Sequence, residues 1–148
     1  MPRSDFVARA RVEIDAPVEE VWAALVDPEQ IREYMFGAEV STDWTVGSPI
    51  TWSGTWEGRS YADKGTILAL DPPWRLAYSH FSPLGGDEDI PENHHNVTID
   101  LAQDETGTDV ILIQGNNKTA ERREHSQANW QRMLNGLKRH VESGGSAA

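Results

Sequence analysis

The C-terminal part of the sequence carries a helical repeat of apolar residues that limits the fold more than any other feature. Between residues 120 and 142, apolar side chains recur at spacings of three and four, at Trp130, Met133, Leu134, Leu137 and Val141. This spacing puts them on one face of an α-helix. A helix of this length needs a long apolar surface to cover, and the rest of the chain must supply it.

The N-terminal part predicts one strand followed by two short helices. Residues 6–14 alternate between apolar and polar side chains, the period of two that is typical of a half-buried strand. Pro17 and Pro28 each suit the first turn of a helix, where a missing N–H costs nothing. Asp27 is expected to cap the second helix, with Gln30 at the capping-box position.

Most of the chain between residues 38 and 114 is strand-like and is divided by prolines, glycines and a turn at 105–107. We expect the glycine and asparagines at 115–117 to end the sheet. The order is then strand, two helices, about six strands and a long helix, which predicts an α+β fold with a curved antiparallel sheet around the C-terminal helix. The later strands are expected at residues 50–56, 61–70, 74–81, 97–101 and 108–114.

The length of 148 residues fits one domain. We expect a single domain over residues 1–148, with an ordered core at about 5–142 and a flexible tail at 143–148. A sheet that curls around one helix leaves a wedge between the two, and that wedge is a natural ligand cavity.

The charge and the cysteine count exclude several classes of function. The formal net charge is −11, so phosphate backbones and anionic membrane surfaces are disfavoured as partners. The absence of cysteine excludes disulfides, thiol nucleophiles and thiolate metal sites, and it agrees with a cytoplasmic location. No apolar run approaches the roughly 20 residues of a membrane span.

Three segments resemble one known superfamily. Val12–Ile31 is similar to the start of the SRPBCC or START-like helix-grip superfamily, and Asn129–Glu142 to the last helix of its branch related to the activator of the heat-shock ATPase chaperone. Trp52–Tyr78 is similar to a hairpin and strand of that branch. The resemblance implies a β-α-α-β6-α fold with a deep hydrophobic cavity. It implies no single function, because members include lipid and hormone binders, aromatase/cyclases and chaperone activators.

The sequence departs from that branch at two places. The branch usually carries a tryptophan at the position of Tyr34, and the loop at residues 82–95 is longer and more acidic than usual. Loops of this length are usually functional or mobile. Eukaryotic chaperone activators have a further N-terminal domain that has no counterpart in this sequence, so a chaperone-related role ranks as an alternative.

The aromatic residues supply most candidates for a ligand site. Six tryptophans exceed what a small core needs, although each alone could simply fill that core. His80 shares a strand face with Tyr78 and is a candidate polar anchor. The predicted ligand-binding set is Trp22, Trp52, Trp56, Tyr61, Tyr78, His80, Trp130, Met133, Leu134 and Leu137.

The sequence offers no catalytic motif and no metal signature. A zinc site needs three or four converging ligands, and the adjacent His94 and His95 would point to opposite faces of a strand. No nucleophile elbow, phosphate loop or zinc-helix motif occurs. We therefore expect no metal, no cofactor and no assigned catalytic residue.

Three hypotheses for the function follow. The first is non-catalytic binding of a small hydrophobic or aromatic molecule in the wedge, which a wedge filled solid by side chains, with no void larger than a water molecule, would exclude. The second is a protein-interaction role like that of the chaperone activators, or self-association. The third is a cyclase- or hydratase-type enzyme that uses an ionisable group, such as His80 or Tyr61, in the same cavity.

Overall fold

The order of elements along the chain is the β-α-α-β6-α order expected from the sequence. The computed structural model describes residues 6–83 and 88–144, with the side chain of Trp56 left out, so most of the expected tail lies outside the described residues. The elements are β1 (Phe6–Ile14), α1 (Val18–Val26), α2 (Pro28–Tyr34), β2 (Glu39–Thr42), β3 (Pro49–Trp56), β4 (Arg59–Asp71), β5 (Arg75–His80), β6 (His95–Asp104), β7 (Gly107–Asn117) and α3 (Ala120–Glu142), with a 3-10 turn at Pro91–Asn93.

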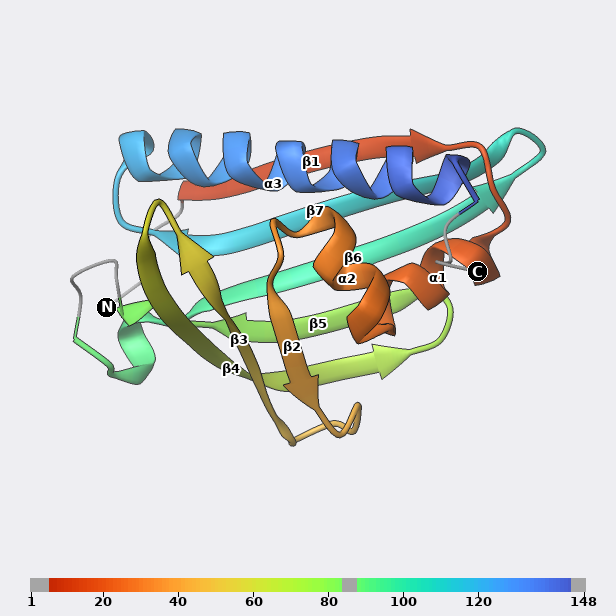
Figure 1. Cartoon of the computed structure of the whole chain (residues 1–148). Coiled ribbons are helices and arrows are strands. Elements are labelled where there is room, and N and C mark those ends of the chain that lie inside the picture. The colour runs from red at the N-terminus through yellow and green to blue at the C-terminus, as the bar shows by residue number, and fades with distance from the viewer. Residues whose placement is uncertain (1–5, 84–87, 145–148) are drawn as a thin grey trace.

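The strands form one antiparallel sheet in the order β1-β7-β6-β5-β4-β3-β2. The sheet curves, and α1, α2 and α3 all lie on its concave side (Figure 1). The predicted α+β fold is therefore confirmed. One expectation was wrong, because β7 does not end at Gln114. It continues to Asn117, which pairs with Phe6 and donates a side-chain hydrogen bond to the Phe6 carbonyl at 3.1 Å.

The helix α3 lies along β1 and covers the strand edge that β7 leaves unpaired (Figure 1). Its apolar residues Met133, Leu134, Leu137 and Val141 are buried. Polar side chains beside them bond to the backbone of β1, which removes an exposed edge that could otherwise pair with another chain. Gln127 accepts from Arg9 N, Gln131 accepts from Arg11 N and donates to Arg11 O, and Lys138 donates to Glu13 O.

Side chains fix where α2 and α3 begin. Thr119 accepts a hydrogen bond from Arg122 N at the start of α3, and Asp27 accepts one from Glu29 N at the start of α2. Gln30 does not complete the expected capping box. Its amide nitrogen donates to the Asp27 carboxylate at 3.1 Å, so Gln30 holds the cap in place without satisfying a backbone N–H.

The backbones of β4 and β5 come unusually close at Gly65. A Cβ built on Gly65 would lie 1.7 Å from the carbonyl oxygen of Ser79, which no side chain can tolerate. The Ser79 hydroxyl accepts a hydrogen bond from Thr66 N in the same place. The pairing of β4 with β5 also shifts its register between Ile67 and Ala69, so this part of the sheet bends where glycine allows it.

We predict that Gly65→Ala lowers the free energy of unfolding by about 3 kcal/mol, because the added methyl group must push two strands apart. Gly115→Ala is the matched control, since a Cβ on Gly115 meets nothing within 4 Å. Urea unfolding of both variants measures the difference. Equal stabilities for the two variants would contradict the close approach at Gly65.

Candidate functional site

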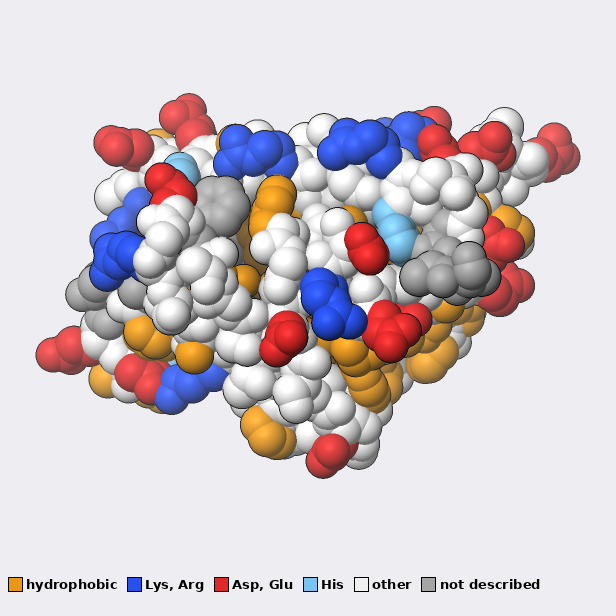
Figure 2. Space-filling model, viewed as in Figure 1, with side chains coloured by type: hydrophobic (Ala, Val, Ile, Leu, Met, Phe, Trp, Pro, Cys, Tyr) orange, Lys and Arg blue, Asp and Glu red, His pale blue; other side chains and the backbone are white. Residues whose placement is uncertain are grey.

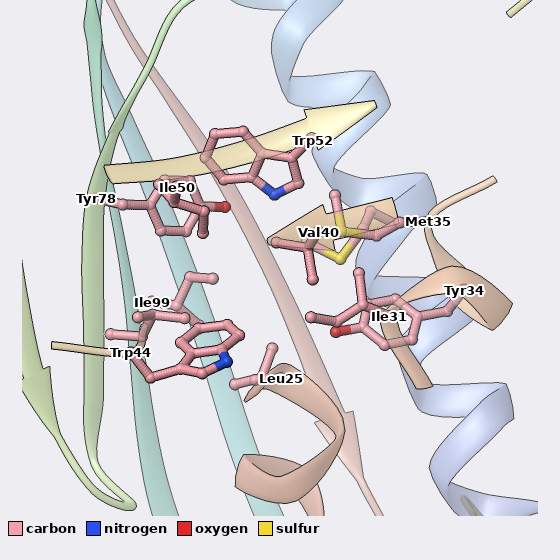
Figure 3. Close-up of a pocket in the computed structure, with 12 residues that line it drawn as sticks. Leu25, Ile31, Tyr34, Met35, Val40, Trp44, Ile50, Trp52, Tyr78 and Ile99 are labelled. Atoms are coloured by element: carbon pink, nitrogen blue, oxygen red, sulfur yellow. The ribbon is translucent and has the colours of Figure 1, made fainter. Parts of the chain in front are cut away.

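A small hollow lies on the concave side of the sheet, between α1, α2, β2 and β3 (Figure 3). Its open volume is about 20 Å³, which is enough for about one water molecule. The wall is almost wholly apolar, and only Met133 comes from α3. The lining residues are Leu25, Ile31, Tyr34, Met35, Val40, Trp44, Ile50, Trp52, Leu76, Tyr78, Ile99 and Met133.

The deep cavity implied by the resemblance is therefore nearly filled with side chains in this structure. Of the predicted ligand-binding residues, Trp52, Tyr78 and Met133 line the hollow. Leu134 and Leu137 are fully buried in the core outside the lining. The half-buried Trp22 and Trp130 pack against the same core, and the side chain of Trp56 is not described. Ligand contact by any member of this set stays a prediction.

Most of the lining residues that come from α1, α2 and the segments around β2 were not predicted from the sequence. Leu25 and Ile31 come from these helices, and Met35 and Trp44 come from the segments on either side of β2. The apolar face of α1 was visible in the sequence, but nothing indicated that it closes a hollow rather than filling the core. Trp44 has a φ of 53°, a left-handed conformation that turns its ring toward the interior.

Two tyrosines bring polar atoms to the hollow. The Tyr34 hydroxyl donates a hydrogen bond to the Ala24 carbonyl at 2.8 Å, which ties α2 to α1. The Tyr78 hydroxyl and the indole nitrogen of Trp52 point toward the hollow (Figure 3), and neither forms a hydrogen bond to any described residue. Burial raises the pKa of Tyr34 and of Tyr78 well above the ordinary value near 10, so both stay protonated.

His80 lies behind Trp52, outside the lining of the hollow. Its Nε2 is 3.0 Å from Oδ2 of Asp63, and its ring lies edge-on to Trp52 with a centroid separation of 5.1 Å. Burial, followed by the nearby Asp63 carboxylate, raises the pKa of Tyr61. The structure thus brings Tyr61 and His80 to one carboxylate, as neighbours of the site rather than as its walls.

The other histidines near the long loop have separate partners. His94 stacks on Phe81 at 5.0 Å and bonds to Asp89, whereas His95 Nδ1 lies 3.1 Å from the Gly115 carbonyl. Among the residues that the structure describes, no three His, Asp or Glu side chains come together as metal ligands would. None of the described helices is long and apolar enough to cross a membrane.

The predicted acidic loop is attached to the sheet through Asp89. Residues 84–87 lie outside the described residues. Asp89 forms an ion pair with Lys64 on β4 and a hydrogen bond with His94, and these hydrogen bonds lower the pKa of the Asp89 carboxyl below its usual range. These contacts are exposed, so they position the loop more than they stabilise the fold.

The surface over the helices, on the concave side of the sheet, combines charged and apolar regions. Lys and Arg side chains follow α3, and hydrophobic side chains reach the surface below that helix (Figure 2). Phe36, in the segment that joins α2 to β2, is 54% exposed. The hollow therefore lies beneath a segment that carries an exposed aromatic side chain.

Comparison with known proteins gives a family. The family model described as "Activator of Hsp90 ATPase homolog 1-like protein" matches residues 15–142. The solution structure of ChR145 from Cytophaga hutchinsonii is 50% identical in sequence, with 99% of this chain and 100% of that chain covered and a TM-score of 0.83. No curated protein matches the sequence.

Two more distant structures share the fold. The solution structure of an Aha1 dimer from Colwellia psychrerythraea is 21% identical, with a TM-score of 0.73 over 95% of this chain and 98% of that one. The crystal structure of DynU16, described as a putative protein in the dynemicin biosynthetic locus, is 20% identical, with a TM-score of 0.80 over 95% of this chain and 49% of that one.

The buried tyrosines predict a loss of stability at high pH. Below about pH 10, Tyr78 is protonated in both the folded and the unfolded chain, so its contribution is constant. Above pH 10 only the unfolded chain ionises, and stability falls by about 1.4 kcal/mol per pH unit for such a group. Tyr78→Phe should remove the Tyr78 share of the slope and leave the share of Tyr34, as followed by urea unfolding between pH 9 and pH 11.

Tyr61→Phe is the comparison for that measurement, because Tyr61 is only partly buried and should change the slope less. Equal slopes in the parent protein and in the Tyr78→Phe variant would show that the Tyr78 hydroxyl reaches water.

Proposed function

Since this chain belongs to the Activator of Hsp90 ATPase homolog 1-like family, we propose that it binds a small apolar or aromatic molecule at the hollow, without catalysing a reaction. The observation that carries the proposal is the pairing of an apolar wall with polar atoms that lack partners. Binding sites for small molecules have this character, with apolar walls and few polar groups that fix orientation.

The polar atoms at the hollow are the Tyr78 hydroxyl and the Trp52 indole N–H. Neither atom is fully enclosed by protein atoms, so each can meet a polar atom of a ligand that enters the hollow. The rings of Trp52 and Tyr78 are tilted against each other at 5.0 Å and offer flat surfaces to a ligand ring. These features support an aromatic ligand.

The hollow must widen before such a ligand can enter, since about 20 Å³ holds little more than one water molecule. Met35 and Met133 face it, and methionine side chains change shape at low cost. The segment after α2 contains Phe36 and Gly37 at φ values of 58° and 81° and forms no regular structure before β2. We propose that this segment opens and that the two methionines adjust.

We also propose that one domain spans the chain and works in the cytoplasm without a cofactor. The match of the family model to residues 15–142 supports a single domain, and the lack of cysteine supports a reducing compartment.

Titration with toluene tests binding at the hollow. We expect the methyl signals of Ile50, Ile99 and Met133 in NMR spectra to shift as toluene binds. Ile99→Phe fills the space and should weaken binding at least about tenfold, whereas Ile99→Val adds room and should tighten it, because apolar affinity follows the space available.

The matched control is Ile111→Phe, since Ile111 lies on the same sheet but is 39% exposed. This variant should bind toluene as the parent protein does. If toluene shifts none of the three methyl signals, or if Ile99→Phe binds it unchanged, ligand binding at this hollow is excluded.

The second candidate is a protein-interaction role, which the family's description as activators of an ATPase favours. We expect the protein to raise the steady-state ATPase rate of the Hsp90-type chaperone from its own host, in a saturable manner. An unrelated protein of similar negative charge controls for non-specific effects of a net charge of −11. An unchanged rate at saturating protein would exclude this role.

A further inference from the structure

The pair formed by Asp63 and His80 has unmet hydrogen-bonding capacity. Asp63 Oδ2 lies 3.0 Å from His80 Nε2. The other atom of each group, Asp63 Oδ1 and His80 Nδ1, is buried and has no hydrogen-bond partner among the described residues. Two neighbouring side chains therefore each satisfy one polar atom and leave the second without a partner.

The chemistry of the pair shows what kind of partner is missing. An ionised carboxylate only accepts hydrogen bonds, so His80 Nε2 must carry the proton that joins the two groups. In a neutral ring Nδ1 is then an acceptor, whereas in a protonated ring it is a second donor; Asp63 Oδ1 accepts in either case. Asp63 Oδ1 therefore needs a hydrogen-bond donor, and His80 Nδ1 needs one when the ring is neutral; a hydroxyl group can serve both atoms, since it donates and accepts.

The residues around Asp63 and His80 indicate what kind of ligand would carry this hydrogen-bond donor. Trp52 lies directly across from Asp63 in the pairing of β3 with β4, and its ring contacts both Tyr78, at 5.0 Å, and His80, at 5.1 Å. Trp52 also lines the hollow. The Trp52 ring thus lies between the hollow and the Asp63–His80 pair, so a ligand in the hollow can reach the pair only if this ring is displaced.

We infer that Asp63 and His80 form the polar end of the ligand site and select an aromatic ligand that carries a hydroxyl group, with the hydroxyl donating to His80 Nδ1. This inference rests on the proposed binding function and narrows it to phenol-type ligands. Gly65 is part of the arrangement, because the close approach of its backbone to Ser79 and His80 brings β5 near β4.

Phenol and toluene are the probes, since they have nearly the same size and differ in the hydroxyl. In the parent protein, NMR titration should give a higher affinity for phenol. His80→Phe keeps a ring beside Trp52 and removes both nitrogens, so the ratio of phenol to toluene affinity should fall by about tenfold, the worth of one hydrogen bond in a buried site. Toluene affinity should stay the same or rise.

His125→Phe is the matched control, because His125 is exposed on α3, and it should leave the ratio unchanged. A second measurement needs no variant. In the parent protein with ¹⁵N-labelled histidine, phenol should shift the Nδ1 signal of His80 and toluene should not.

The outcomes separate the two proposals. If toluene binds but phenol binds no better, or if His80→Phe keeps the ratio of the parent protein, the selection by His80 is excluded and binding at the hollow stands. The same holds if phenol leaves the His80 signal unmoved, in which case ordered water satisfies the pair. If neither probe binds, the binding function fails and this inference fails with it.

Discussion

The antiparallel pairing of β1 with β7, together with the attachment of α3 to the other edge of β1, is the constraint on which the rest of the structure depends. It places the first strand between the last strand and the last helix. The concave face of the sheet is thereby enclosed at the β1 side, where Leu134 and Leu137 are fully buried. The remaining space on that face lies toward β3 and β2, and α1 and α2 cover it.

The hollow is a consequence of this division of the concave face. The apolar side chains of α3 fill one half, and the shorter α1 and α2 leave a gap over the other, where Trp52 and Tyr78 meet. More of the residues that line the hollow therefore come from α1 and α2 than from α3. The polar atoms gather on the same half, because Asp63 and His80 come from β4 and β5, close to the bend at Gly65.

Local patterns in the sequence were enough to predict most of the fold. The α3 period and the alternation in β1 are each set by neighbouring residues, so their bounds could be read directly. The prediction that the sheet ends at residues 115–117 was wrong. Glycine and asparagine usually end strands, but the side chain of Asn117 holds this residue in β7 by hydrogen bonds to the carbonyls of Phe6 and Gln114.

The site was harder to predict than the fold for a physical reason. A regular spacing of aromatic residues indicates packing against the core, but not which of them faces a space; Trp130 was predicted to line the site and does not, whereas Trp44 was not predicted and does. The volume of the hollow depends on how all side chains pack together. The Asp63–His80 pair depends on the registers of two strand pairings and on the backbone contact at Gly65, and none of these features produces a recognisable sequence motif.

The place of β1 in the sheet also bears on how the chain folds as it is made. Ile14 pairs with Thr108 and Phe6 with Asn117, so within the part of the chain that the structure describes, β1 pairs with a strand that is synthesised much later. Residues 6–14 cannot form this pairing until residues 107–117 have been synthesised. Such distant pairings slow folding and lengthen the time during which an edge is open to other chains. In the folded protein both edges of β1 depend on distant parts of the chain, one on β7 and the other on α3.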